Sequence, residues 1–230
     1  MNNNTSSPLA TVHSALRLAC DKAHRVHDEV CLLAVSKTRP AAEIRALAEQ
    51  GQRHFGENYL QEALDKMPAL TDLPLVWHFI GPLQSNKTRD IAAHFDWVHS
   101  VDRLKVAKRL SDQRSDQQPP LHVCLQVNVD NEASKSGVAL DDVAALAAQV
   151  NALPRLRLRG LMAIPRADSD DHNRAAFRRV AMTLSHLRNT MPHLDTLSMG
   201  MSDDFAVAIE EGATIIRLGT ALFGPRPRPQ

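Results

Sequence analysis

The feature that most constrains the fold is an alternation of short apolar runs with longer helix-patterned stretches along most of the chain. The strand-like runs occupy residues 31–36, 53–56, 75–80, 96–100, 121–129, 157–164, 195–199 and 214–218. The helical patterns occupy residues 8–28, 40–50, 58–67, 86–94, 102–111, 140–151, 171–190 and 202–211. Strands that alternate with helices pair in parallel through right-handed crossovers. The sequence therefore predicts an α/β fold, a single (β/α)8 TIM barrel with an extra N-terminal helix, and periodicity leaves a doubly wound open sheet as the alternative.

The size and charge of the chain narrow the kinds of partner that it can have. Its 230 residues match the length of one barrel, so we expect one domain over residues 1–230, with residues 1–7 and 226–230 flexible. Lys and Arg number 27 against 26 Asp and Glu, which gives a net charge of +1. A chain so close to neutral has no strong field for DNA, RNA or anionic lipid, so neither nucleic acid nor a membrane is an expected partner. The expected oligomeric state is a monomer.

The cysteines and the N-terminus indicate a cytoplasmic protein. Cys20, Cys31 and Cys124 are odd in number, far apart and surrounded by apolar residues, which is typical of reduced thiols rather than of disulfides. The opening residues MNNNTSSP lack the basic and apolar regions of a secretion signal, and no apolar run approaches the length of a membrane span. No spacing typical of a metal site occurs, so no metal is predicted.

Polar and glycine-containing segments follow most of the predicted strands. They are Lys37, GENY (56–59), GPLQSNK (81–87), Asn128, SMGMSDD (198–204) and RLGT (217–220). Each of them alone is accounted for by a turn glycine or a helix cap. In a barrel, however, the C-terminal ends of all strands meet at one rim, which is where barrel active sites lie. The segments together therefore predict a functional site at that rim.

Lys37 directly follows the apolar run CLLAVS, which would place its ammonium group at the mouth of the barrel. A lysine whose side chain merely reaches out to water would give the same pattern. An ammonium group held among apolar groups loses hydration, which favours the neutral amine that forms a Schiff base with a carbonyl. Two carbonyls fit: a sugar-type substrate, as in a class I aldolase, or the aldehyde of pyridoxal 5'-phosphate (PLP).

The other end of the chain favours a ligand that carries a phosphate. A phosphate monoester binds backbone N–H groups at glycine-rich loops and helix N-termini, and barrels commonly place this site after strands seven and eight. Gly200 and Ser202 follow the seventh predicted strand, with Ser202 as the expected N-cap of the next helix, and Gly219 and Thr220 follow the eighth. Arg217 shares a side of its strand with Gly219, so it could face the ring nitrogen of a pyridine and leave that nitrogen unprotonated.

Several longer segments carry a family resemblance. They are VSKTRP, FGENYLQE, WHFIGPLQSNKTRDI (77–91), SKSG, RGLMAIP, LSMGMSDD and IRLGTALFG. With these segments the chain closely resembles the pyridoxal phosphate homeostasis protein family, from about residue 8 to Pro225. The resemblance implies a barrel similar to the N-terminal domain of alanine racemase and other fold type III enzymes, with PLP bound as a Schiff base.

The resemblance also implies a role for particular residues. Lys37 would be the Schiff-base lysine and Arg217 the partner of the pyridine nitrogen. The remaining cofactor-binding residues would be Ser202, Gly219 and Thr220 at the phosphate, Asn58 and His78 along the pocket, and Ser198 and Met199 in its wall. The family has no established catalytic turnover, so the implied function is to buffer PLP and deliver it, with PLP-dependent apo-enzymes as candidate acceptors.

Two lysine-related positions bear on a delivery route. Arg39 stands where many relatives have a second lysine, which puts in doubt any transfer scheme that uses that position. Lys135, in the SKSG segment, remains available as a second PLP site, and an ion pair with the neighbouring Glu132 is an equally good explanation for it.

Two enzymes are the competing hypotheses. A PLP-dependent amino-acid racemase needs a second base opposite the lysine, usually a tyrosine, and Tyr59 is the only tyrosine in the chain. We expect Tyr59 to start a helix outside the pocket. A phosphate-sugar aldolase that uses Lys37 without a cofactor ranks last, because no pair of acid and base carboxylates accompanies Glu57 at the strand ends.

Overall fold

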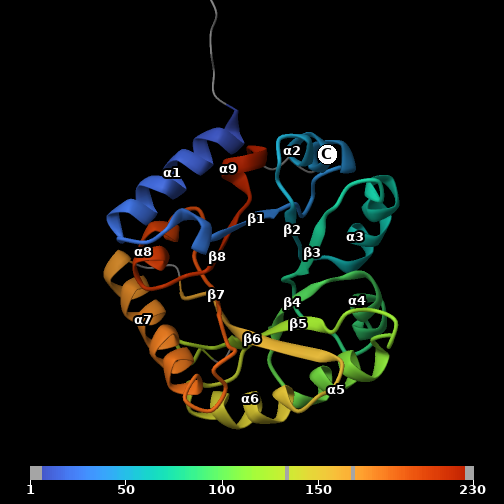
Figure 1. Ribbon diagram of the computed structural model, residues 1–230, viewed down its shortest axis with the longest axis vertical. Helices are drawn as coiled ribbons and strands as arrows, with labels where there is room; N and C mark the ends of the chain where they lie inside the picture. Colours follow the sequence, from blue (N-terminus) through green and yellow to red (C-terminus); the bar gives the residue numbers. More distant parts are fainter. Residues whose placement is uncertain (1–6, 133–134, 167–168, 226–230) are drawn as a thin grey trace, which may run out of the picture.

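The computed structural model describes residues 7–132, 135–166 and 169–225. Within these ranges eight parallel strands close into a barrel in the order β1 to β8, with helices around the outside (Figure 1). The strands are β1 Cys31–Val35, β2 His54–Glu57, β3 Val76–Phe79, β4 Trp97–Val101, β5 Leu121–Val127, β6 Leu156–Ala163, β7 Thr196–Ser198 and β8 Ile215–Leu218. Because β1 pairs with β8, the sheet is closed, which confirms the TIM barrel and rules out the open sheet.

The helices occupy the intervals between the strands. They are α1 Pro8–Lys22, α2 Ala41–Glu49, α3 Leu60–Lys66, α4 Thr88–His94, α5 Leu104–Gln113, α6 Val143–Asn151, α7 Asp170–Leu187, α8 Phe205–Glu210 and α9 Thr220–Phe223. Short 3-10 helices are η1 His27–Glu29, η2 Met67–Leu70 and η3 Leu140–Asp142. No helix in the described ranges is long and apolar enough to cross a membrane. The sequence did not predict α9, which is a single turn directly after β8.

The extra N-terminal helix is confirmed, but it is shorter than predicted. Ser7 caps its start by accepting a hydrogen bond from the Ala10 N–H at 3.2 Å. The helix ends at Lys22 and not at residue 28, because His24 takes a left-handed φ of 54°. The following N–H, that of Arg25, then bonds back to the Cys20 carbonyl at 2.9 Å, the pattern of a Schellman ending. Flexibility was predicted for residues 1–7 and 226–230, and all of these except Ser7 lie outside the described ranges.

The hydrophobic core lies between the barrel and the ring of helices. Alternate strand residues point outward into it, among them Phe55, Val98, Leu125 and Ile216, all fully buried. Helix α1 buries one face, formed by Leu9, Val12, Leu16, Ala19 and Cys20, and packs against α8 and α9 outside the seam between β1 and β8 (Figure 1).

The inside of the barrel is unusually polar. Barrel interiors are mostly filled by layers of branched aliphatic side chains. Here the fully or almost fully buried residues include His78, His99, Ser198 and Arg217, each from a different strand. They bond to one another rather than to the helices, so the interior forms a polar network that reaches toward both ends of the barrel.

Candidate functional site

The C-terminal ends of β1 and β8 lie side by side because the two strands pair in parallel. Ala34 pairs with Leu218, and a Cβ added at Gly219 would lie 3.3 Å from the carbonyl oxygen of Val35. Lys37 lies just beyond the end of β1, and Gly219 lies directly after β8. The lysine from the beginning of the chain and the glycine from its end are therefore at the same rim of the barrel.

The backbone turns sharply directly after Lys37. Thr38 has a φ of 64°, a left-handed conformation that is uncommon for a β-branched residue, and its N–H donates to Glu62 Oε1 at 2.5 Å. Arg39 is buried, and its Nη2 donates to the Gly224 carbonyl at 2.6 Å. These bonds tie the turn to α3 and to the segment after α9, so they fix the direction in which the chain leaves β1.

A buried carboxylate between β2 and α3 supports the same turn. Glu57 is fully buried, and its Oε1 accepts from the Ser36 hydroxyl at 2.5 Å and from the Lys66 ammonium at 2.8 Å. Lys66 also donates to the Ser36 carbonyl at 3.0 Å and to Glu62 Oε1 at 2.7 Å. Burial raises the pKa of Glu57, and the Lys66 ammonium and the Ser36 hydroxyl oppose that rise. The network holds Ser36, the residue directly before Lys37.

Asn58 carries an acceptor that the protein leaves unused. Its Oδ1 is buried and has no hydrogen-bond partner among the described residues. A buried amide oxygen of this kind is available to a donor on a bound molecule. The main chain of Asn58 is closely covered, because a Cβ at Gly81 would overlap its carbonyl oxygen. Glycine at position 81 is therefore what lets the loop after β3 pass over Asn58.

Arg217 lies inside the barrel with its guanidinium group pointing toward β6 and β7. Its Nη1 donates to the carbonyl and hydroxyl oxygens of Ser198, at 2.6 and 2.8 Å, and its Nη2 donates to the Ala163 carbonyl at 3.0 Å. Burial lowers the pKa of Arg217 to about 10, and the charge of Asp204 opposes this. The group is therefore still charged at neutral pH.

The two predicted phosphate loops differ in how well they match the expectation. Gly219 and Thr220 begin the turn of α9 at the rim, as described above. Ser202, however, does not cap the next helix, because α8 begins at Phe205 with Asp204 as its N-cap. The carboxylate of Asp204 accepts from the Met201 N–H at 2.6 Å, so Ser202 is left in an exposed turn before the helix.

The family resemblance implied that Ser198 and Met199 both line the pocket wall, but their side chains point to different sides of the sheet. The Ser198 hydroxyl is inside the barrel, bonded to Arg217. The Met199 side chain is fully buried with the outward-facing core residues, because side chains alternate along the strand. Met199 therefore does not contribute its side chain to the inside of the barrel.

His78 lies in the barrel interior between two other histidines. Its Nε2 is 2.9 Å from Nδ1 of His54, and its Nδ1 is 2.9 Å from Nε2 of His99. Burial lowers the pKa of His78 well below its usual value, and His99 and His54 add to this. Because both ring nitrogens are already bonded, His78 could contact a molecule at the rim only through ring carbons.

Comparison with known proteins identifies the family. A family model described as alanine racemase, N-terminal domain, matches residues 14–227. The pyridoxal phosphate homeostasis protein of Pseudomonas aeruginosa is 60% identical over 219 residues, which cover 95% of this chain and 94% of that protein. The chain belongs to the pyridoxal phosphate homeostasis protein family. Its counterpart in Escherichia coli K12 is 50% identical over 228 residues, 97% of each chain.

Solved structures place this homeostasis family on the alanine racemase fold. PipY of Synechococcus elongatus, 43% identical, has been solved without PLP and with PLP bound, with TM-scores of 0.81 and 0.79 over 91% of this chain and 99% of PipY. Alanine racemase of Corynebacterium glutamicum has a TM-score of 0.66 at 18% identity, over 94% of this chain and 61% of the racemase, which shows a common fold. The curated relatives are named for homeostasis of the cofactor and not for a reaction.

Sequence reasoning about this family member missed two groups of residues. One is the ion-pair network of Glu57, Glu62 and Lys66 that holds the turn before Lys37. Glu57, a charged residue at the end of a buried strand, was the signal in the sequence for this network. Its partner Lys66 lies in a separate helix, so the pairing could not be identified. The other group is His54 and His99, which join His78 inside the barrel. Side chains alternate between the two faces of a strand, so the sequence suggests which residues point inward. Which of the inward-pointing histidines meet depends on the register between the strands.

Replacing Lys66 with Met tests the ion-pair network. We expect the free energy of unfolding to fall by about 3 kcal/mol, because the change leaves an uncompensated buried charge on Glu57. Loss of the ammonium raises the already raised pKa of Glu57 further, so the folded state favours the protonated carboxyl. Stability should therefore fall as the pH rises past the usual value of 4.5, and urea unfolding should show a larger loss at pH 8 than at pH 5.

The matched control is the double variant Glu57→Gln/Lys66→Met. It carries no charge at either position, so it should recover most of the lost stability and remove the added pH dependence. If Lys66→Met lowered the free energy of unfolding equally at pH 5 and pH 8, the role given to Glu57 would be contradicted.

Proposed function

We propose that this protein binds PLP at the rim where β1 and β8 end, holds it as a Schiff base on Lys37, and buffers and delivers it without turning over a substrate. The observation that carries the proposal is the pairing of β1 with β8, which brings Lys37 and the Gly219–Thr220 turn to one rim. The presence of PLP in PipY, a protein 43% identical over nearly its whole length, supports the same ligand. The names of the curated relatives support homeostasis as the purpose.

The residues at the rim fit a phosphorylated aldehyde. When bound, PLP supplies an aldehyde carbon for the lysine amine and a conjugated ring that absorbs visible light. The first N–H groups of the α9 turn have no partner within the helix, and Gly219 has no side chain to block an approach to them. The exposed hydroxyl of Ser202 stands on the loop from β7 as a further phosphate donor.

The remaining assigned residues face the ring or support those that do. Arg217 is the proposed partner of the pyridine nitrogen, and Ser198 orients it through two hydrogen bonds. The unused Oδ1 of Asn58 is the proposed acceptor for a donor on the cofactor. His78 contributes shape through its ring, and Met199 contributes through its main chain, because its side chain lies in the outer core.

The position of the single tyrosine supports a carrier rather than a racemase. Tyr59 is the N-cap of α3, and 55% of it is exposed. A second base has to stand across the substrate from the lysine, within hydrogen-bond reach of the same carbon. An exposed residue at the start of an outer helix is poorly placed for that task. We therefore propose delivery to apo-enzymes rather than amino-acid racemisation.

The attachment point is tested by Lys37→Ala. We expect the purified protein to be yellow and this variant to lose the visible absorption band, because the amine that bonds the aldehyde is gone. Borohydride reduction followed by peptide mass mapping should locate the modification on Lys37. Lys135→Ala is the matched control and should keep the band, since Lys135 is paired with Glu132 at 2.8 Å. A borohydride-reducible adduct retained by Lys37→Ala would show that another lysine holds the cofactor.

The partner of the ring nitrogen is tested by Arg217→Glu. A carboxylate at this position would favour a protonated pyridine, so the absorption maximum of the bound cofactor should shift. Arg89→Glu, on the exposed surface of α4, makes the same change of charge and should leave the spectrum unaltered. Far-UV circular dichroism establishes that both variants are folded. An unaltered spectrum in folded, PLP-loaded Arg217→Glu would place the ring nitrogen elsewhere.

The absence of turnover is tested with L-alanine. Because Tyr59 is poorly placed as a second base, the PLP-loaded protein should form no D-alanine above the rate of free PLP, measured by chiral chromatography with alanine racemase as the positive control. Formation of D-alanine that Lys37→Ala abolishes would make the protein a racemase.

A further inference from the structure

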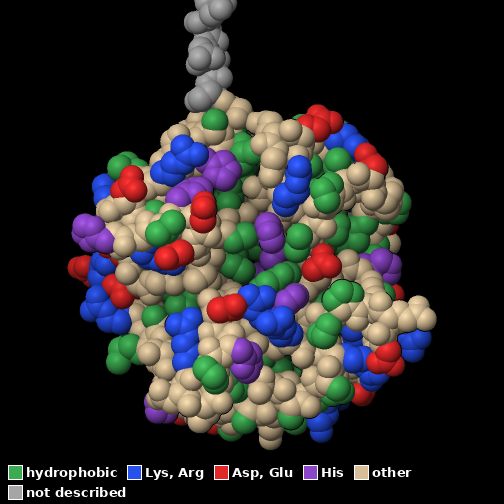
Figure 2. Space-filling model, in the orientation of Figure 1, with side chains coloured by type: hydrophobic (Ala, Val, Ile, Leu, Met, Phe, Trp, Pro, Cys, Tyr) green, Lys and Arg blue, Asp and Glu red, His purple; other side chains and the backbone are tan. Residues whose placement is uncertain are grey.

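The N-terminal end of the barrel, opposite the Lys37 rim, holds a pocket. Its volume is about 430 Å³. Figure 2 shows this face, with histidine side chains in a central hollow and charged groups at the edge. The lining includes the first residues of five strands, which are Cys31, His54, Trp97, Thr196 and Ile215. Of the residues assigned to PLP binding, His78 alone also lines this pocket.

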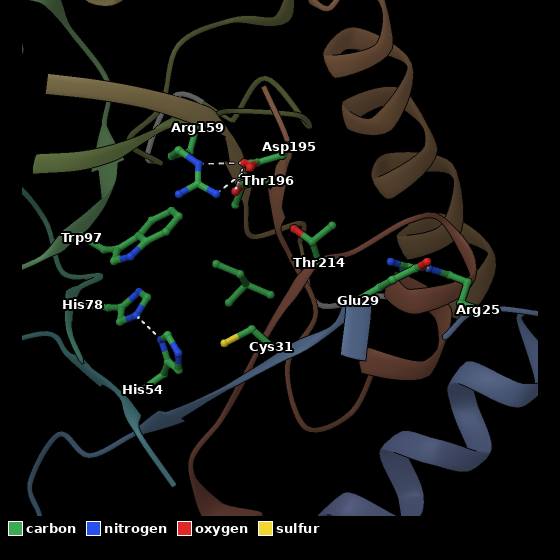
Figure 3. A pocket seen from close by; sticks show the side chains of 11 residues that line it. Arg25, Glu29, Cys31, His54, His78, Trp97, Arg159, Asp195, Thr196 and Thr214 are labelled. Carbon is green, nitrogen blue, oxygen red and sulfur yellow. Dashed lines mark hydrogen bonds and ion pairs between the residues drawn. The ribbon is translucent and has the colours of Figure 1, made fainter. Parts of the chain in front are cut away.

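A continuous hydrogen-bond chain links this pocket to Arg217. In order, Arg217 Nη1 is 2.8 Å from Ser198 Oγ, which is 2.7 Å from His99 Nδ1. His99 Nε2 is 2.9 Å from His78 Nδ1, and His78 Nε2 is 2.9 Å from His54 Nδ1. Figure 3 shows the last link, with His54 and His78 at the wall of the pocket. The chain therefore runs through the barrel interior from the buried guanidinium to the pocket.

The direction in which hydrogen bonds are donated along this chain follows from Arg217. An arginine can only donate, so Ser198 Oγ accepts from Arg217 and its own hydrogen is available for His99 Nδ1. Burial lowers the pKa of His99 to about 3, so its ring is neutral. When Nδ1 accepts from the Ser198 hydroxyl, the single proton of this neutral ring is on Nε2. In the reverse order the Ser198 hydroxyl hydrogen would have no acceptor among the described residues.

Hydrogen bonds are donated in the same direction at the rings of His78 and His54. His99 donates from Nε2 to His78, and His78 donates from Nε2 to His54. The pKa values of His78 and His54 are lowered by burial, so these rings are neutral as well. His54 accepts at Nδ1, and its own proton is therefore on Nε2, as a donor at the pocket.

Other groups around the pocket also present donors. The Thr214 hydroxyl oxygen accepts from the Leu197 N–H at 2.9 Å, and its hydrogen has no partner in the described ranges. Nη2 of Arg25 likewise has no hydrogen-bond partner among the described residues. The carboxylate of Asp195, in contrast, already accepts from Arg159 at 2.9 and 2.5 Å. Glu29, also in the lining, accepts from Arg25 Nε through Oε2 at 3.4 Å. Apart from this carboxylate at the edge, the groups left over for a ligand are hydrogen-bond donors.

We propose that this pocket binds a small carboxylate that carries one flat ring, with the carboxylate accepting a hydrogen bond from His54 and the ring lying against the apolar lining. Trp97, Cys31 and Ile215 supply that lining, and the volume suits a single ring. A bound amine would need His54 to accept, which would reverse every bond as far as Ser198. The donor-only Arg217 therefore makes the distant pocket selective for acceptors.

The test is a titration of the full, 15N-labelled protein with benzoate, and with benzylamine as a ligand of similar size and opposite charge. Long-range proton–nitrogen NMR correlations identify which nitrogen of each imidazole carries the proton. We expect Nε2–H on His54, His78 and His99 in the free protein. Benzoate should shift the His54 signals saturably and bind at least about tenfold more tightly than benzylamine, as one hydrogen bond to a charged group allows.

Two variants separate the pocket from the chain. His54→Phe keeps a ring but removes the donor, so benzoate should bind about tenfold more weakly, while His186→Phe on the exposed side of α7 should bind as the unmodified protein does. Ser198→Ala removes the link that sets the direction without touching the pocket. It should shrink the preference for benzoate over benzylamine.

Four results would overturn the proposal: no saturable His54 shift up to about 10 mM benzoate, equal affinity for the two ligands, a proton on Nδ1 of His54, or an unchanged preference in folded Ser198→Ala. None of these measurements depends on Lys37 or on bound PLP, so they stand apart from the test of the cofactor site.

Discussion

A guanidinium group that can only donate hydrogen bonds lies inside the barrel, and the rest of the interior is arranged to accept from it. A buried charge is costly unless acceptors surround it. Arg217 finds them in the carbonyl and hydroxyl oxygens of Ser198 and in the carbonyl of Ala163. The serine in turn leads to the buried histidines. A polar network therefore runs through a barrel interior that is usually filled by aliphatic layers, and it links the two ends of the barrel.

The fold and the rim of the site were predictable because they depend on local patterns. The alternation of strand and helix identified all eight strands to within about two residues at their ends, and the barrel rule then brought Lys37 and Gly219 to one rim before any contact was known. A left-handed residue was not predictable in the same way. His24 ends α1 early, yet nothing in the letter sequence distinguishes it from a histidine that continues a helix.

The details that the sequence did not predict depend on competition between two candidate caps, on the packing of a helix against a strand, or on the register between strands. Ser202 and Asp204 are both good N-caps, and the sequence alone does not decide between them; burial of the carboxylate against α7 favours Asp204. Glu57 and Lys66 come from a strand and from the helix that follows it, so their pairing requires the packing angle between the two. The histidine chain requires the stagger of three neighbouring strands, which sets which rings meet.

The seam between the first strand and the last has a consequence for synthesis on the ribosome. Residues 31–35 leave the exit tunnel early, but their neighbour at residues 215–218 emerges only when translation is almost finished. The proposed cofactor site uses both of these strands, so a nascent chain would lack the complete site for nearly the whole of its synthesis. Under the proposed function, loading of the vitamin would follow release, and truncated products would not sequester it.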